Sequence, residues 1–272
     1  MAMIVKHNML AINSNRMLGV NTQTQSKITE KLSSGYKINR AADDAAGLAI
    51  SEKMRRQVRG LSQASLNAQD GISMVQTAEG ALNEVHDMLQ RLNELSVKAE
   101  NGTLTSTDRH FVDAEVQQLL SEIDRVASTA TFNEQKLLDG TLTGCSLQVG
   151  AEASEYITVA ISSMNTTGLS ITGKDAQSAT NAASLNTAVK EALTTLSTQR
   201  SNLGAIQNRL EHTVNNLDNV VENTTAAESQ IRDTDMASEM VKYSNANILS
   251  QAGQSMLAQA NQSNQGVLSI LG

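Results

Sequence analysis

Apolar residues recur at seven-residue intervals along much of this chain, and this repeat restricts the fold more than any other feature. Two long series carry it, each accompanied by a second set of mostly apolar residues three or four positions away. The series are Leu61, Ala68, Val75, Leu82, Leu89 and Val189, Leu196, Leu203, Leu210, Leu217. Such heptads are typical of helices that pack as a coiled coil. The later helix, expected over roughly residues 177 to 231, would be on the order of 80 Å long at about 1.5 Å per residue.

Composition also favours long helices over an ordinary compact core. The 272 residues include no proline and no tryptophan, and aromatic residues make up 2%. Because proline breaks helix interiors, its absence suits long uninterrupted helices. A further helix is predicted by alternating steps of four and three at Val112, Val116, Leu119, Ile123 and Val126. Ser106 or Thr107 is placed to cap its start. We therefore expect a mainly α fold, an elongated helical bundle or coiled coil of long helices.

The segment at about residues 137–173 departs from this helical pattern. It contains turn signals, and Ile157, Val159 and Ile161 alternate with other residues at a period of two. That alternation predicts a small β-hairpin. So few strands cannot bury a core alone, so the hairpin is not expected to be a separate domain.

Several classes of function are disfavoured by what the sequence contains. The formal net charge of −7 argues against nucleic acid as a partner, because binding phosphates requires clustered Lys and Arg. No apolar run approaches the length of a membrane span. Cys145, the single cysteine, leaves no internal disulfide and no cysteine metal site. The four histidines lack metal-ligand spacing, and the usual catalytic motifs are missing. We expect neither an enzyme nor a cofactor.

The two ends of the chain are weakly amphipathic and poor in charge. At the C-terminal end an apolar stripe is interleaved with uncharged Asn, Gln and Ser, and no basic residue follows Lys242. The stripe comprises Met236, Met240, Leu249, Met256, Val267 and Ile270. Packing against the same chain is one interpretation. A membrane-surface helix would need the missing Lys and Arg on its polar face. We expect the stripe to mediate polymerisation, by pairing of the terminal helices and burial among copies of the chain.

The stretch RAADDAAGLAI, residues 40–50, joins two helical patterns with small side chains around two adjacent carboxylates. Asp43 or Asp44 can cap the following helix and favour its positive N-terminus. The alternative of acid–base chemistry at this pair is much weaker than capping. The small residues, among them Ala42 and Gly47, would allow close approach of neighbouring segments.

Two long stretches resemble bacterial flagellin. SSGYKINRAADDAAGLAISEKMRRQVRGLSQASLNAQDGISMVQTAEGALNEV is similar to its N-terminal half, and VENTTAAESQIRDTDMASEMVKYSNANILSQAGQSMLAQANQSNQGVLSILG to its C-terminal half. The resemblance covers nearly the whole chain apart from about residues 140–180, as in a filament subunit without the variable outer domains. It implies that residues 1–42 and 232–272 pair as the inner layer of a filament, and that 43–231 form an outer helical-bundle domain. Ala42, Asp43, Asp44 and Gly47 would then lie at an inter-layer elbow that packs between subunits.

The resemblance also implies a function, partners and a location. The chain would be a structural subunit that self-assembles into the flagellar filament for motility, a helical homopolymer outside the cell. It would be exported without a cleaved signal peptide and handled by a flagellar export chaperone and a filament cap. Two alternatives stay open at this point. One is a hook–filament junction protein, which shares the terminal pattern, and the other is a cytoplasmic coiled-coil scaffold, which heptads alone would allow.

A further implication of the resemblance is recognition by an animal innate immune receptor, Toll-like receptor five, through the outer helices. The positions that match the recognised pattern are Arg91 and Leu95 in LQRLNEL and Glu115 in VDAEVQQLL. Gln90 and Glu94 are expected on the same patch. Arg91 would offer a planar head with several donors, Leu95 an apolar plug, and Glu115 an acceptor from the facing helix. The alternative is that these residues serve self-assembly.

Overall fold

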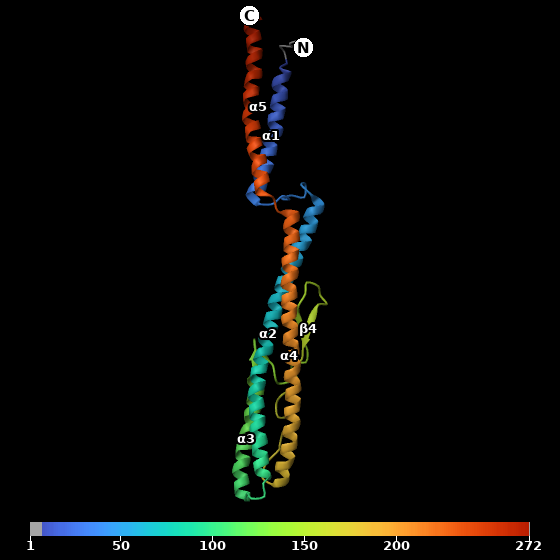
Figure 1. Ribbon diagram of the computed structural model, residues 1–272, viewed down its shortest axis with the longest axis vertical. Helices are drawn as coiled ribbons and strands as arrows, with labels where there is room; N and C mark the ends of the chain where they lie inside the picture. Colours follow the sequence, from blue (N-terminus) through green and yellow to red (C-terminus); the bar gives the residue numbers. More distant parts are fainter. Residues whose placement is uncertain (1–6, 272) are drawn as a thin grey trace. The chain divides into compact units, whose positions relative to one another are not determined.

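The computed structural model describes the backbone of residues 7–271 and the side chains of residues 7–263 (Figure 1). It confirms the mainly α fold: long helices with two small antiparallel β-ribbons. In chain order the elements are α1 (Met9–Ser34), α2 (Ala45–Glu100), α3 (Ser106–Thr129), β1 (Thr131–Phe132), β2 (Gln135–Lys136), β3 (Cys145–Gln148), β4 (Tyr156–Val159), α4 (Ala179–Arg232) and α5 (Met236–Leu271).

The chain divides into two compact units. The terminal unit comprises Met1–Arg56 and Asn223–Gly272, and the bundle unit comprises Gln57–Glu222. The boundaries expected near residues 42 and 232 therefore fall inside the terminal unit. Within this unit Arg55 contacts Glu228 at 3.4 Å and Arg232 contacts Glu52, and these ion pairs connect the start of α2 to the end of α4.

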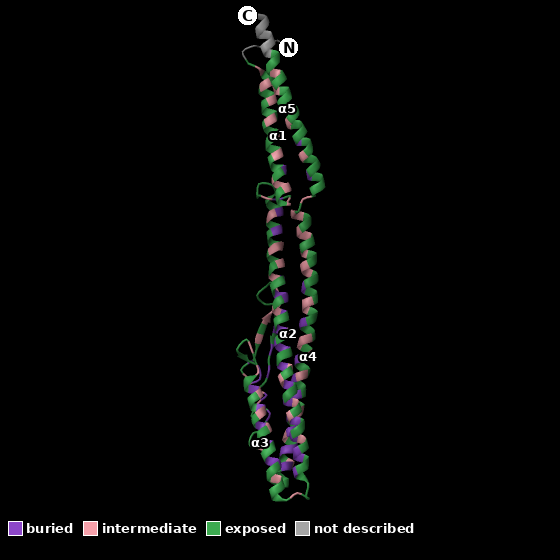
Figure 2. Ribbon diagram, turned by 90° about the vertical axis from the view of Figure 1, so that its left-hand side faces the viewer, coloured by how far each residue is buried: buried purple, intermediate pink, exposed green. Residues whose placement is uncertain are grey.

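The bundle unit has a continuous apolar core between α2, α3 and α4, where the buried residues gather in Figure 2. The heptad prediction is confirmed here. Val75, Leu82 and Leu89 on α2 are fully buried, as are Val189, Leu196 and Leu203 on α4. Burial of this apolar area is the main stabilising term for such a unit.

The start of α3 is set one residue earlier than expected. Thr105 is the N-cap, and its side chain accepts a hydrogen bond from the Asp108 N–H while Asp108 accepts one from the Thr105 N–H. This is a capping box, which satisfies two otherwise unpaired donors. The Asp108 carboxylate also accepts from the Thr105 hydroxyl at 2.7 Å, and this hydrogen bond first, then the one from the Thr105 N–H, holds the pKa of Asp108 below its ordinary value.

The predicted hairpin is confirmed as β3 and β4, with Cys145 opposite Val159 and Leu147 opposite Ile157. Ile157, Val159 and Ile161 are buried, as their alternation indicated. Leu147 packs over α2 at Gly71, where a Cβ would lie 2.3 Å from its Cδ1. The glycine in the heptad thus lets the hairpin approach the helix.

The second ribbon, β1 with β2, was not predicted. Its turn is made by Asn133 and Glu134, both with positive φ (46° and 66°). Asn often adopts that conformation, but Glu does so rarely, so the sequence carried only half of the usual turn signal.

The terminal unit is built on an antiparallel pair, α1 with α5, which run side by side in Figures 1 and 2. The Asn8 amide donates to the Ala260 carbonyl at 2.9 Å, and the Asn21 amide donates to the Ala246 carbonyl at 2.8 Å. Few side chains are buried between the two helices. Among the described residues these are Ile28 on α1 and Ala246 and Glu239 on α5. The apolar contact between α1 and α5 is therefore small, and the hydrogen bonds of the Asn side chains supply part of the specificity of this helix pairing.

Candidate functional site

The connector between α1 and α2 shows which carboxylate caps the helix. Asp44 is the cap, because its side chain accepts from the Gly47 N–H at 2.9 Å and its carbonyl accepts from the Leu48 N–H at 3.0 Å. Asp43 instead accepts from the backbone N–H of Arg40 and Asn39, and these bonds, Arg40 first, lower the pKa of Asp43.

The small residues of this connector differ in their surroundings. Ala42 is exposed, whereas Gly47 is buried. A Cβ at Gly47 would lie 2.5 Å from Asp44 Oδ2 and 2.8 Å from Ile38 Cδ1. The need for a glycine is therefore explained within one chain. Packing of this connector between subunits stays a prediction.

Large apolar residues are exposed mainly on the two terminal helices, which are largely green in Figure 2. On α5 the exposed fractions are 47% for Met236, 52% for Met240, 61% for Leu249 and 62% for Met256. Met9, Leu10, Ile12, Met17 and Val20 are likewise exposed on α1. Val267 and Ile270, the remaining members of the predicted stripe, lie outside the residues whose side chains are described.

The residues predicted as one stripe on α5 form two faces. Met240 and Leu249 are nine residues apart, which at about 3.6 residues per turn places them about 180° apart around the helix. Met236 lies one turn from Met240, and Met256 lies two turns from Leu249. A list of apolar residues along a long helix does not by itself define one face; the spacing between its members does.

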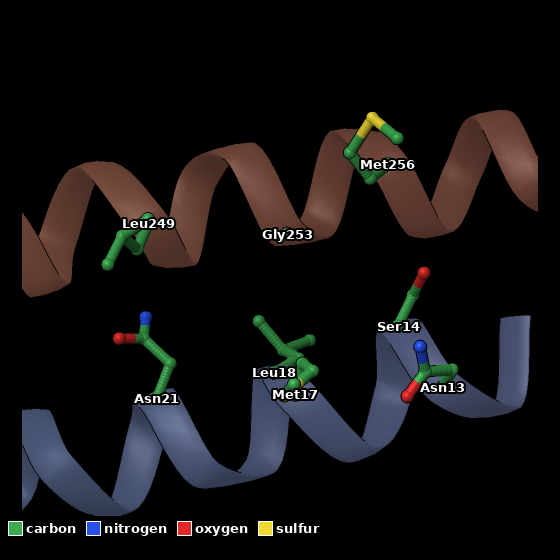
Figure 3. A pocket seen from close by; sticks show the side chains of 8 residues that line it. All are labelled: Asn13, Ser14, Met17, Leu18, Asn21, Leu249, Gly253 and Met256. Atoms are coloured by element: carbon green, nitrogen blue, oxygen red, sulfur yellow. The ribbon is translucent and has the colours of Figure 1, made fainter. Parts of the chain in front are cut away.

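A groove of about 400 Å³ runs along the Leu249 face, between α5 and α1. Figure 3 shows Leu249, Gly253 and Met256 from α5 above Met17, Leu18 and Asn21 from α1, with Leu18 directed toward Gly253. A Cβ at Gly253 would lie 3.3 Å from Leu18 Cδ1, so the glycine keeps the groove open where the helices come close. Asn13 and Ser14 complete the lining, which contains no charged residue.

The bundle unit brings together most of the residues predicted for receptor contact. Arg91 on α2 donates from Nε to Glu115 on α3 at 2.9 Å and from Nη1 to Glu94 at 2.8 Å. These hydrogen bonds, Glu94 first and Glu115 second, raise the pKa of Arg91 above its ordinary value. Gln90 is exposed beside them. The result is a charged patch that bridges two helices.

Leu95 requires a correction. It is 1% exposed and belongs to the core of the bundle unit, so its side chain cannot form an apolar plug on the surface. The reason is its position on α2: Leu92, Leu95 and Ala99 follow steps of three and four, which place all three against the neighbouring helices. Leu95 supports the helix that carries Arg91 and Glu94.

A polar network in the terminal unit was missed by sequence reasoning. The Arg232 guanidinium lies 4.8 Å from the centre of the Tyr36 ring and pairs with Glu52, and its side chain is 12% exposed. The Lys37 N–H donates to the Arg232 carbonyl at 2.7 Å, and the Thr234 N–H donates to the Gly35 carbonyl at 3.0 Å. These residues are nearly 200 positions apart, and no local pattern marks them.

Other kinds of site were sought in the described part of the chain. Within residues 7–271, no cluster of His, Cys, Asp and Glu has the arrangement of a metal site. None of the helices described is both long enough and apolar enough to cross a membrane.

Comparison with known protein families identifies the class of protein to which this chain belongs. Residues 5–143 match the bacterial flagellin N-terminal helical region, and residues 186–271 match the bacterial flagellin C-terminal helical region. The chain belongs to the bacterial flagellin family. Residues 144–185, which contain β3 and β4, separate the two matched regions, and the variable outer domains are lacking.

Relatives agree over the full length. The chain is 53% identical to a flagellin of Halalkalibacterium halodurans over 271 residues, with 99% of this chain and 100% of the relative covered. It is 47% identical to the flagellar filament 31.3 kDa core protein of Treponema maltophilum, with the same coverage. A crystal structure of Bacillus cereus flagellin superposes with a TM-score of 0.50 at 31% identity, covering 56% of this chain and 88% of that one.

These matches establish the class of function. The chain is a structural subunit of the extracellular flagellar filament, which serves motility, and it is not an enzyme. The alternative of a cytoplasmic scaffold is therefore wrong. The full-length relatives, flagellins and a filament core protein, also favour the filament over the hook–filament junction.

Proposed function

We propose that the terminal unit forms the inner layer of the filament and that polymerisation buries its exposed apolar side chains against other copies. The supporting observation is the concentration of large exposed apolar residues on α1 and α5. A monomer rarely leaves so much apolar surface in water without a partner. The partner surface must also be largely uncharged, because α5 has no charged residue after Lys242.

Electron microscopy of seeded assembly tests this proposal. Met240→Gln combined with Leu249→Gln removes exposed apolar area with little loss of helix propensity. We expect this variant to remain helical by circular dichroism and to form few or no filaments. Val97→Gln is the matched control, because Val97 is 54% exposed on α2 in the bundle unit. Normal filaments from the double variant would refute a polymerising role for the terminal unit.

We further propose that an export chaperone covers these apolar residues before assembly and that a filament cap guides their burial at the growing end. The exposed apolar side chains of α5 support both parts of this proposal, because they would favour aggregation if no other protein covered them. Co-purification with the candidate chaperone from the same genome is the test. The double Gln variant should bind it more weakly than Val97→Gln does, and equal binding would contradict this part of the proposal.

A second function is supported by the charged patch on the bundle unit. We propose that Gln90, Arg91, Glu94 and Glu115 are recognised by Toll-like receptor five of an animal host. Arg91 is held by carboxylates on two helices, so its donors are presented in a fixed position and less side-chain entropy is lost on binding. Leu95 would contribute only by supporting α2 from the core.

A receptor reporter assay on purified monomers tests recognition. Arg91→Ala and Glu115→Ala should each lower the response. Arg125→Ala is the matched control, because Arg125 makes a similar exposed ion pair with Glu122 on α3. If all three variants signal like the unmodified chain, the patch is not the receptor site.

A further inference from the structure

The exposed apolar side chains of α5 include two groups on opposite sides of the helix, with Val241 and Ile248, 62% and 61% exposed, between them. One group lies on the groove face, along Leu249, Gly253 and Met256, to which Met17 of α1 contributes. The other, the methionine face, is formed by Met236 and Met240. Met240 lies nine residues before Leu249, which places it about 180° away around α5. No single contact with one neighbour can cover both sides of the helix.

The groove is a hollow that flexible apolar side chains can fill, and the methionine face carries such side chains. The groove is concave, has a volume of about 400 Å³ and is lined by apolar and uncharged side chains. The methionine face presents two unbranched side chains one turn apart, each about half exposed. Methionine has three rotatable bonds and a polarizable sulfur, which suit it to filling irregular apolar grooves.

Symmetry restricts how two copies can use these faces. A twofold contact would place like face against like face, groove on groove or methionine face on methionine face, and leave the other face of both copies in water. A contact between unlike faces covers one face of each type and leaves one of each type free. Such a heterologous contact repeats from copy to copy, and where its rotation does not close into a ring it produces an open helical polymer, as a filament requires.

From these observations we infer that the Met236–Met240 face of one copy occupies the Gly253 groove of the next copy. This inference rests on the proposed polymerising role of the terminal unit and adds which surfaces meet. The partner is a second copy of this chain, because the polymer contains that chain and because the same helix supplies both the uncharged groove and an exposed face of flexible methionines.

Chain-termination experiments test this pairing. Gly253→Leu fills the groove, and leucine has a higher helix propensity than glycine, so α5 should remain folded. Met256→Glu blocks the same groove by charge at a residue that is 62% exposed. Met236→Gln with Met240→Gln removes the other face. Gly80→Leu, at a glycine of α2 with no neighbour near its Cβ position, is the matched control.

Each blocked variant is added at a small molar fraction to unmodified subunits growing from seeds, and filament length is measured by electron microscopy. A subunit with one blocked face can still dock through its other face, but it then presents a face that accepts no successor. A single-face variant is one in which only the groove or only the methionine face is blocked. We expect at least one type of single-face variant to stop elongation at an end, and a variant with both faces blocked to have no effect at the same fraction.

The possible outcomes separate this inference from the proposed function. If the single-face variants fail to assemble alone but never stop elongation, polymerisation through the terminal unit stands and the pairing of unlike faces is wrong. If they assemble alone as the Gly80→Leu control does, both are wrong. Termination by the single-face variants, absent when both faces are blocked, supports both.

Discussion

The carboxylate of Asp44 accepts a hydrogen bond from the Gly47 N–H at 2.9 Å and also occupies the space that a side chain at Gly47 would need. The cap and the glycine are therefore one arrangement at the start of α2. Neighbouring Asp43 has a different role, since it accepts hydrogen bonds from the connector backbone at Asn39 and Arg40.

Removing the cap should loosen the first turn of α2. We expect Asp44→Ala to cost about 0.5–2 kcal/mol of helix stability, the usual range for an N-cap. Amide hydrogen exchange at Gly47 and Leu48 should accelerate. Asp43→Ala is the control, and it should affect the amides of Asn39 and Arg40 instead. The same pattern of exchange in both variants would contradict the separate roles.

Asp113 should make the bundle unit sensitive to acid. Burial would raise the pKa of Asp113, but hydrogen bonds from the Ala176 N–H at 2.9 Å and from Gln177 and Gln117 outweigh it, and the pKa is lowered. The folded state therefore binds this proton less readily than the unfolded chain. Its stabilisation is complete above the unfolded pKa and is lost as the pH falls through the folded pKa.

Asp113→Asn tests this linkage. At neutral pH we expect a loss of about 1–3 kcal/mol, because buried donors lose a charged acceptor. The difference in unfolding free energy between the two proteins, measured by urea denaturation, should shrink in acid. A difference that stays constant from neutral pH to below the aspartate range would show that the charge of Asp113 is not responsible.

Leu95 should behave as a core residue. Leu95→Ala removes a side chain that is 1% exposed, and we expect a loss of about 2–5 kcal/mol in the unfolding free energy of the bundle unit. Leu95→Met keeps the volume and should cost less than about 1.5 kcal/mol. Thermal unfolding distinguishes these outcomes. Equal melting temperatures for Leu95→Ala and the unmodified chain would place Leu95 at the surface after all.

Arg232 should stabilise the terminal unit through its planar guanidinium group. The contact with the Tyr36 ring favours a guanidinium, so Arg232→Lys should retain the charge but lose stacking. We expect Arg232→Leu to lower the stability of the connectors by about 0.5–2 kcal/mol, the range of a cation–π contact. Trypsin cleavage after Lys37 and Arg40 in assembled filaments should accelerate. Unchanged cleavage in both variants would mean that Arg232 does not hold the connector.

The sequence by itself determined the long helices of the bundle unit and most of the residues in its core. Leu82, Leu89, Leu196 and Leu203 follow a seven-residue period, and that period is a local property of an α-helix. The hairpin of β3 and β4 was equally local, since Ile157 and Val159 share one buried face of the strand and alternate with exposed residues. Such elements are predictable because the same few residues both form the element and present its buried side.

Only the tertiary structure decided which surfaces remain exposed. Leu95 and Arg91 lie one turn apart on α2, yet Leu95 is buried in the core of the bundle unit and Arg91 pairs at the surface with Glu115 of α3. The described residues of the stripe predicted on α5 divide between a groove shared with α1 and an opposite methionine face, and Arg232 meets Tyr36 from the far end of the chain. Exposure and long-range pairing depend on where the neighbouring helix lies, and no window of sequence contains that neighbour.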